Sequence, residues 1–268
     1  MKKFLENIKS PRDIKGLNIE ELKQLAQEIR ETITETVTFT GGHLATNLGA
    51  VEIIIALHYC FDFSKDRLVF DVGHQVYPHK LLTGRYKQFP TLRCKGGLSG
   101  FPNRKESEYD VFNVGHASTS ISQALGLACG TEIQKEDRYI VVLIGDGAMT
   151  GGMAFEGLNQ AGHLKKKLLV VLNDNEMAIS PTVGALANYL SKIRATHIYH
   201  EIKDDVKYIL DKIPRISRPV EDAVRRAIEA IKTAVIPGQI FTELGFRYRG
   251  PIDGHDLKLL IETINDLK

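Results

Sequence analysis

Two short apolar runs with a helical segment between them constrain the fold of this chain most. The runs are Tyr139–Ile144 and Leu168–Leu172, and both are rich in valine, isoleucine and leucine. Continuous apolar runs of this length are typical of parallel strands that are buried on both faces. The stretch therefore predicts a βαβ unit. For the whole chain we predict an α/β fold, with a mostly parallel sheet and helices on both faces.

Polar residues follow each of these predicted strands. Gly145-Asp146-Gly147 closes the first strand and Asn173-Asp174-Asn175 closes the second. Ligands bind at the carboxyl edge of open α/β sheets, so we expect Asp146 and Asn175 to lie at one such edge. Their oxygens suit Mg²⁺, which keeps coordination places for phosphate oxygens, and the following helix would direct its positive N-terminus at those phosphates. Each motif taken alone is also ordinary turn chemistry at a strand end.

Composition limits the classes of protein that fit. The 268 residues, of which 43% are hydrophobic and 25% charged, are sufficient for one large globular domain or two smaller ones, and we expect one domain spanning residues 1–268. A net charge of +2 gives no reason to expect a nucleic-acid partner. The three cysteines have no metal-type spacing and the start has no apolar core of a signal peptide, so we expect a cytoplasmic protein. We predict no membrane contact, because no window approaches the roughly 20 apolar residues of a membrane span.

A third predicted strand, Arg67–Val72, leads into a loop that carries two histidines, a tyrosine and a lysine. His74 in this loop is a candidate for phosphate binding or proton transfer, since histidine titrates near neutral pH. The alternative is a polar loop that ends in a proline turn. The pattern leaves the roles of His79 and Lys80 open.

Two further loops carry candidate residues. A long loop over Arg93–Asp110 leads to a predicted short strand at Val111–Val114, and the turn Gly115-His116-Ala117-Ser118 then precedes a helix from about Ser120. Such a turn is a preferred place for a diphosphate or a cofactor ring, although a Ser/Thr helix cap explains the same residues. His43 lies in a glycine-rich loop between two predicted helices and is either a solvated turn residue or a catalytic one.

The ends of the chain show clearer helix signals. Asn18 and Glu21 form a capping pattern before a helix over about Ile19–Val37, and Asp256 opens a final helix. Between about residues 181 and 219 the periodicity weakens, and we expect an excursion away from the sheet with mobile parts.

Longer strings within the chain resemble a known family. The sequence is similar to the N-terminal domain of the 1-deoxy-D-xylulose-5-phosphate synthases, which belong to the transketolase group of thiamine diphosphate enzymes. The resemblance covers nearly the whole chain and includes the strings SPRDIKGLNIEELKQLAQEIR, GGHLATNLGAVEI, DVGHQVYPHKLLTGR, GFPNRKESEYDVFNVGHASTSIS, GDGAMTGGMAFEGLNQAG, NDNEMAIS and GPIDGHD. A GDG motif followed by NDN is itself the signature of thiamine diphosphate enzymes. Ala117 departs from the usual GHSST string.

The resemblance implies a function and a set of site residues. It implies condensation of pyruvate with glyceraldehyde 3-phosphate, with loss of CO₂, by means of thiamine diphosphate and Mg²⁺. It assigns His43 to the substrate and Asp146, Asn175 and the carbonyl of Met177 to Mg²⁺. The residues it assigns to the cofactor are His74, Gly115, His116, Ala117, Gly147, Ala148 and Asn175.

Length is where the chain departs from the family. Family members are more than twice as long and add a pyrimidine-binding domain, which supplies a glutamate that activates the cofactor, and a C-terminal domain. We expect both domains to be absent here, so that the chain alone binds Mg²⁺ and thiamine diphosphate weakly and has no appreciable activity. A homodimer or a complementary chain would then complete the site. The alternatives are one subunit of a split transketolase and a non-enzymatic pyrophosphate-binding or interaction module.

Overall fold

The computed structural model describes residues 3–174, 184–191, 193 and 238–268. The chain divides into two compact units, the first formed by Met1–Ser180 with Ile252–Lys268 and the second by Pro181–Pro251. The excursion predicted over about residues 181–219 belongs to the second unit, and only part of it lies within the described residues.

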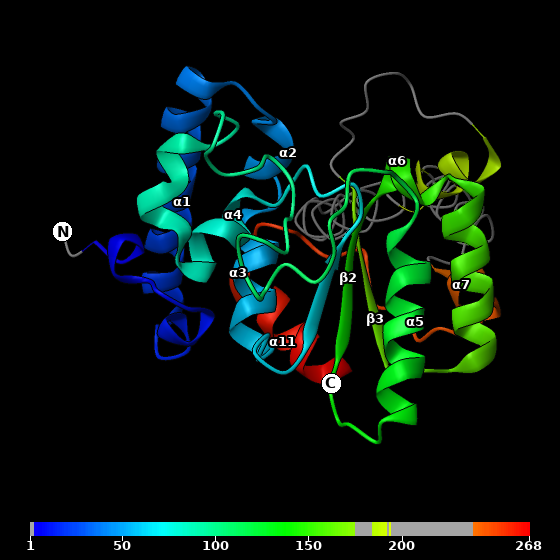
Figure 1. Ribbon diagram of the computed structural model, residues 1–268. Helices are drawn as coiled ribbons and strands as arrows, with labels where there is room; N and C mark the ends of the chain where they lie inside the picture. The colour runs from blue at the N-terminus through cyan, green and yellow to red at the C-terminus, as the bar shows by residue number, and fades with distance from the viewer. Residues whose placement is uncertain (1–2, 175–183, 192, 194–237) are drawn as a thin grey trace, which may run out of the picture. The chain divides into compact units, whose positions relative to one another are not determined.

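A parallel sheet lies at the centre of the first unit (Figure 1). Its described strands are β1 (Arg67–Phe70), β2 (Ile140–Gly145) and β3 (Leu168–Asn173), in the order β1-β2-β3. Both neighbouring pairs are parallel, and the register sets Phe70 opposite Leu143 and Gly145 opposite Asn173. The prediction of an α/β fold with a parallel sheet is confirmed.

The two faces of the sheet pack against different helices. Leu68, Phe70, Val141 and Leu143 join the main hydrophobic core, which also contains α1 (Ile19–Thr40), α3 (Val51–Cys60) and α11 (Leu257–Leu267). The alternate residues of the strands point to the other face, where α5 (Ser120–Ile133) packs against the sheet and α7 (Gly152–Leu164) packs against α5. Figure 1 shows α3 and α11 on one side of the strands and α5 and α7 on the other. Helices therefore cover both faces, as predicted.

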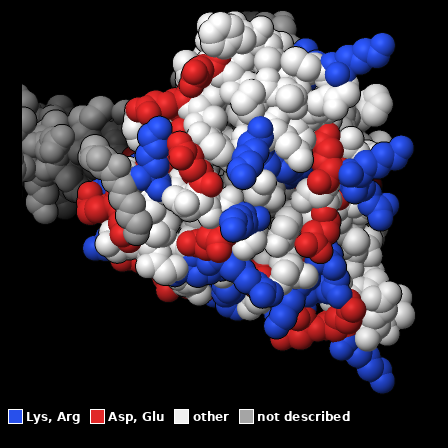
Figure 2. Space-filling view, turned by 60° about the vertical axis from the view of Figure 1, so that its left-hand side comes forward, with Lys and Arg blue, Asp and Glu red and all other residues white. Residues whose placement is uncertain are grey.

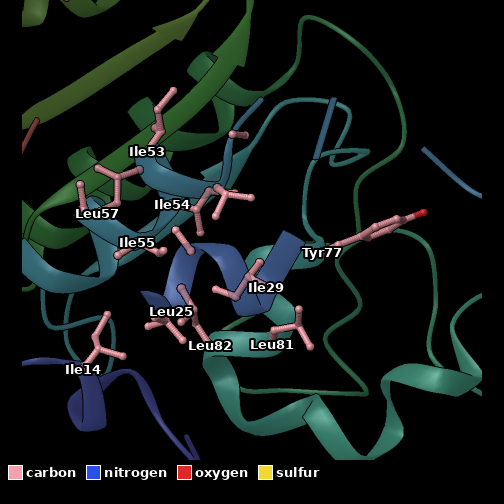
Figure 3. Packing of buried hydrophobic residues seen from close by; sticks show 14 of the residues in the cluster. Ile14, Leu25, Ile29, Ile53, Ile54, Ile55, Leu57, Tyr77, Leu81 and Leu82 are labelled. Carbon is pink, nitrogen blue, oxygen red and sulfur yellow. The ribbon is translucent and has the colours of Figure 1, made fainter. Parts of the chain in front are cut away.

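Helix α3 lies in the middle of this core. Its side chains from Val51 to His58 are all buried, and Figure 3 shows Ile54 and Ile55 on the side of α3 toward Leu25 and Ile29 of α1. Helix α4 (Tyr77–Lys80) also contacts α3. Full burial of one such aliphatic side chain contributes about 1.5–3 kcal/mol to stability. A helix that is apolar on all sides is typical of a buried position, and this burial anchors the loops at both ends of α3.

The predicted helix starts are confirmed. The Asn18 side chain accepts a hydrogen bond from the amide of Glu21, and the Glu21 carboxylate accepts one from the amide of Asn18. Asp256 caps α11 in the same way by accepting from the amide of Leu259. Helix α1 continues to Thr40, beyond the predicted end at about Val37, and stops at Gly41 in the left-handed region at φ 70°.

One local prediction is wrong. Val111–Val114 is not a strand, because the segment has no ladder partner among the described residues, although Phe112 and Val114 line a small hollow beside β1. The helix after the GDG motif, α6 (Asp146–Met149), lasts a single turn before the chain turns at Gly151, and α7 begins separately at Gly152. The short elements of the first unit are η1 (Leu5–Asn7), η2 (Pro11–Ile14), α2 (Ala45–Leu48), η3 (Leu81–Arg85) and η4 (Tyr86–Thr91).

The described part of the second unit has its own small aromatic contact. Phe241 of α10 (Gln239–Glu243) stacks on Tyr248 with ring centroids 5.6 Å apart, and the amide of Ile240 donates to the hydroxyl of Tyr189 at 3.1 Å. Gly238 precedes α10 at φ 77°, and a side chain there would collide with the Tyr248 ring.

Charges of both signs are mixed on the face shown in Figure 2. Ion pairs near the start of the chain include Lys3–Glu6 and Lys23–Glu20, which are exposed and contribute little to stability. Of the helices that the structure describes, none combines the length and the apolar character that crossing a bilayer requires.

Candidate functional site

The carboxyl edge of the sheet brings the two polar strand ends together. Because Gly145 pairs with Asn173, the next residues, Asp146 and Asp174, leave the two strands side by side. Asp146 is buried and is the first residue of α6. The other predicted metal ligands, Asn175 and Met177, lie outside the described residues, so the complete ligand set stays a prediction. Within the described ranges no group of three or more histidine, cysteine, aspartate or glutamate residues is placed to hold a metal ion.

Ser118 connects the turn before α5 to the other strand ends. Its amide donates to Asp71 Oδ1 at 2.7 Å, and its hydroxyl donates to the carbonyl of Ala148 at 2.8 Å. Asp71 immediately follows β1, whereas Ala148 lies in α6 after β2. A Cβ on Gly151 would come within 2.0 Å of the Ser118 hydroxyl oxygen, so this close approach requires glycine. One serine therefore ties together the loops that carry Gly115 to Ala117 and Gly147 to Ala148.

The start of α5 is capped from a distance. Asp71 accepts from the amide of Ser120 at 3.0 Å as well as from that of Ser118, while the local cap residue Thr119 makes no side-chain capping bond. The Ser/Thr cap considered from the sequence is therefore replaced by a buried carboxylate at the end of β1. This carboxylate satisfies amides that would otherwise lack partners, and it fixes the turn relative to the sheet.

The predicted cofactor residues of these two loops face open space. Gly115, His116, Ala117 and Gly147 are exposed. A Cβ built on Gly115 or Gly147 would meet nothing within 4 Å. Backbone with no side chain above it allows a ligand to approach closely, as phosphate sites require. Ala148 is half-buried, and its carbonyl accepts the hydrogen bond from the Ser118 hydroxyl.

The two predicted site histidines are neighbours. The rings of His43 and His74 meet edge to face with centroids 5.6 Å apart, and Phe101 lies 6.0 Å from His43. Burial, followed by the nearby charge of Arg93, lowers the pKa of His43 below its ordinary value of 6.5. The pKa of His74 is lowered by burial and then by His43, which outweigh the opposing effect of Asp71. Both rings are therefore mainly neutral at pH 7.

His74 has an unsatisfied polar atom. Its Nδ1 is buried and has no hydrogen-bond partner among the residues that the structure describes. Buried polar atoms are nearly always hydrogen-bonded, and leaving one unpaired costs about 1–3 kcal/mol. The atom is thus available to a ligand or a water molecule at this edge of the site.

His79 and Lys80, whose roles the sequence left open, belong to a buried ionic cluster with Arg85, Glu106 and Asp110. Asp110 accepts two hydrogen bonds from Arg85, at 2.8 and 2.9 Å, and lies 3.0 Å from His79 Nε2. Lys80 donates to Glu106 at 2.5 Å. Burial lowers the pKa of both His79 and Lys80. The cluster holds the loop over Arg93–Asp110 against α4 and η3, which places Phe101 beside His43.

Comparison with known proteins identifies the family of the chain. The family model described as 1-deoxy-D-xylulose-5-phosphate synthase matches residues 5–268. The chain belongs to this family. It is 55% identical over 265 residues to a 1-deoxy-D-xylulose-5-phosphate synthase of Thioalkalivibrio sulfidiphilus, covering 99% of this chain and 41% of the relative. The synthase of Alkaliphilus oremlandii is 53% identical over 268 residues, covering 100% of this chain and 43% of the relative. The chain thus spans less than half the length of these synthases.

Solved transketolases share the fold. A transketolase from Campylobacter jejuni matches with a TM-score of 0.66 and 18% identity, covering 94% of this chain and 36% of that chain. One from Pichia stipitis matches with a TM-score of 0.63 and 15% identity, covering 92% of this chain and 34% of that chain. These matches confirm the predicted transketolase-like N-terminal fold.

Three residues that organise the site were not identified as such from the sequence. Asp71 lies within the predicted strand Arg67–Val72, Ser118 lies in a turn that a local helix cap also explains, and Asn47 received no role. Their contacts reach residues far along the chain, so no local pattern identifies them. The one available signal was the position of Asp71 at the carboxyl end of a predicted strand, which is shared with Asp146.

Proposed function

We propose that this chain forms the Mg²⁺ and diphosphate part of a thiamine diphosphate site in a 1-deoxy-D-xylulose-5-phosphate synthase. The reaction proposed for the whole enzyme condenses pyruvate with glyceraldehyde 3-phosphate and releases CO₂. The observation that carries the proposal is the convergence of the strand ends, where Ser118 joins Asp71 to Ala148 and the β2–β3 register sets Asp146 beside Asp174. Family membership supports the same assignment.

The residues present fit this cofactor. Asp146, with Asn175 and the carbonyl of Met177, would hold Mg²⁺, whose preferred ligands are oxygens. The exposed backbone at Gly115 and Gly147 leaves room for a ligand, and the unpaired Nδ1 of His74 gives a nitrogen that can bond to it. When bound, thiamine diphosphate supplies the reactive ring for breaking and forming carbon–carbon bonds, while the protein binds and orients it.

His43 is proposed to face the substrate. The residue is exposed, and its ring lies against His74 and Phe101. The ring is mainly neutral at pH 7, because partial burial and then Arg93 lower its pKa. A neutral imidazole donates a hydrogen bond from one nitrogen and accepts one at the other. His43 is therefore suited to hold or move a proton at a substrate oxygen.

Cofactor binding is the direct test of the metal and diphosphate part. Titration calorimetry of the purified chain with thiamine diphosphate should show binding that depends on MgCl₂ and disappears in EDTA. Because loss of even a supporting residue around a metal costs about 10–100-fold in affinity, Asp146→Asn should weaken binding at least about tenfold. Asp137→Asn is the matched control, since this exposed carboxylate precedes the opposite end of β2 and pairs with Lys167. Equal affinities for wild type and Asp146→Asn would refute the assignment.

The reaction itself is tested with a complementary chain. The 268-residue chain is mixed with a second chain that carries the remaining part of a relative, and pyruvate-dependent CO₂ release is measured with glyceraldehyde 3-phosphate present. We expect turnover in the mixture and little in either chain alone. Transfer between sugar phosphates without pyruvate would instead indicate a transketolase. Thiamine diphosphate binding without turnover in any combination would favour a binding module. The mass of the active complex shows whether the chain assembles with a second copy of itself or with the complementary chain.

A further inference from the structure

We propose that Asn47 is a positioning residue that fixes His43 and His74 relative to each other. The inference rests on the proposed function, in which both histidines face the cofactor or the substrate. Asn47 touches neither of those ligands in this assignment, and it acts through the backbone of the two histidines.

The side-chain amide of Asn47 forms hydrogen bonds with the backbone of three residues. It is fully buried in α2, and its Nδ2 donates to the carbonyl of His43 at 2.6 Å and to the carbonyl of His74 at 2.8 Å. Its Oδ1 accepts from the amide of Tyr77 at 2.9 Å. These partners fix the orientation of the amide, because only the nitrogen end has hydrogens to give to two carbonyls.

One nitrogen atom therefore sets the spacing of the two histidine backbones. His43 lies in the loop between α1 and α2, and His74 lies in the loop after β1, so no local element holds them together. With both carbonyls bound to the same NH₂ group, the rings meet at 5.6 Å. Tyr77 gives a second, weaker contact, since its hydroxyl lies 3.4 Å from the amide nitrogen of His43. Figure 3 shows this hydroxyl pointing away from the aliphatic core that surrounds the labelled isoleucines.

Other residue types do not replace asparagine here. An aspartate would direct a carboxylate oxygen at two carbonyl oxygens, which repel it. An alanine leaves two partly buried carbonyls without their donor, and a serine has one hydrogen for the two of them. A glutamine adds a methylene group to a site with no exposed surface. The position thus demands two donors and one acceptor on a short side chain.

The test measures how strongly the two rings affect each other. The ring of Phe101 packs against His43. The charge of Arg93 acts on the pKa of His43, and the charge of Asp71 acts on the pKa of His74. His43 is one cause of the lowered pKa of His74, so His43→Gln should raise the pKa of His74. NMR titration of the His74 ring gives this shift in the wild-type background and in Asn47→Ala.

We expect the shift caused by His43→Gln to fall to less than half in Asn47→Ala, because the two loops lose their common donor. Asn159→Ala is the matched control, an exposed asparagine on α7, and it should leave the shift unchanged. A full-size shift in folded Asn47→Ala would overturn the proposal.

A measurement on the unmodified chain covers the case in which Asn47→Ala fails to fold. Because Asn47 is fully buried and both of its amide hydrogens are bonded to carbonyls, its side-chain amide protons should exchange slowly with solvent, whereas those of Asn159 exchange fast. Rapid exchange at Asn47 would also overturn the proposal. Neither measurement involves cofactor or substrate, so it stands apart from the calorimetric test of Asp146. If both proposals hold, Asn47→Ala also binds thiamine diphosphate more weakly than the Asn159→Ala control.

Discussion

Replacing Asp110 by asparagine should destabilise the protein strongly, because the change removes the buried negative charge that accepts from Arg85 and lies beside His79. Asp110 is 3% exposed. It accepts two bonds from Arg85, lies 3.0 Å from His79 Nε2 and accepts from the amide of Asn103 at 2.7 Å. In Asp110→Asn the new amide nitrogen would face at least one of these donors. The Arg85 guanidinium would keep Glu106 as its carboxylate partner among the described residues, at 3.5 Å, and the hydroxyl of Thr83 at 2.8 Å.

Removing one partner of a buried ion pair costs about 3–5 kcal/mol, because the remaining charge stays buried. For a chain of this size that loss corresponds to a decrease in melting temperature of roughly 6–20 °C. Urea denaturation of wild type and Asp110→Asn, followed by circular dichroism, gives the change in the free energy of unfolding. The control is Asp137→Asn, which breaks the exposed pair with Lys167 and should cause no measurable change. A midpoint within error of wild type for Asp110→Asn would refute the reasoning.

The pH dependence of the free energy of unfolding is an independent test of the buried ionic cluster around Asp110. Burial alone would raise the pKa of Asp110, but the hydrogen bonds from His79 and Arg85 hold it far below its ordinary value of 3.8. A carboxylate with a lowered folded-state pKa contributes stability that is present above the unfolded pKa and is lost as the pH falls below it. The difference in unfolding free energy between wild type and Asp110→Asn should therefore be constant at neutral pH and decrease below about pH 3.8. A difference that grows in acid would contradict this account.

Three further changes test other parts of the structure. Ser118→Ala removes the hydrogen bond to Ala148 and should lower the free energy of unfolding by about 1 kcal/mol, as measured by urea denaturation. No loss would show that other contacts hold the two loops together. Asp256→Ala removes the cap of α11 and should also cost about 1 kcal/mol, with Asp256→Asn close to wild type; equal losses would argue against capping. Burial raises the pKa of the Cys60 thiol to about 11, so iodoacetamide at pH 8 should label the exposed Cys94 before Cys60. Peptide mass spectrometry gives the order of labelling, and the reverse order would contradict the burial of Cys60.

The parts of the fold that are determined by residues close together along the chain could be predicted from the sequence. The apolar runs located β2 and β3 to within one residue at each end, since a strand buried on both faces leaves little choice of residue. The capping pair of Asn18 and Glu21 could also be predicted, because the two residues are three positions apart in the sequence. The prediction for Val111–Val114 was wrong because an apolar segment becomes a strand only where a neighbouring backbone offers free hydrogen-bonding groups.

The candidate site could be predicted only in part, for the same reason. Strand ends located Asp146, and the glycine-rich turn located Gly115, because both features follow from the chain on either side of them. The contacts of Asn47 and Ser118 depend on segments that fold against them from elsewhere, such as Asp71 in the case of Ser118. Sequence spacing carries no information about such distant hydrogen bonds.

The end of the sheet opposite the site has a practical consequence for labelling and for building fusions. Before β2 and β3 the chain makes exposed left-handed turns at Lys135 and Lys165, with φ of 56° and 50°. The exposed ion pair Asp137–Lys167 joins the segments that follow these turns. Six residues of β2 separate this end from Asp146, a distance of about 20 Å. A fluorophore or a short inserted peptide at either turn should therefore leave the metal and diphosphate loops undisturbed, and it would report on assembly with a partner chain from a safe distance.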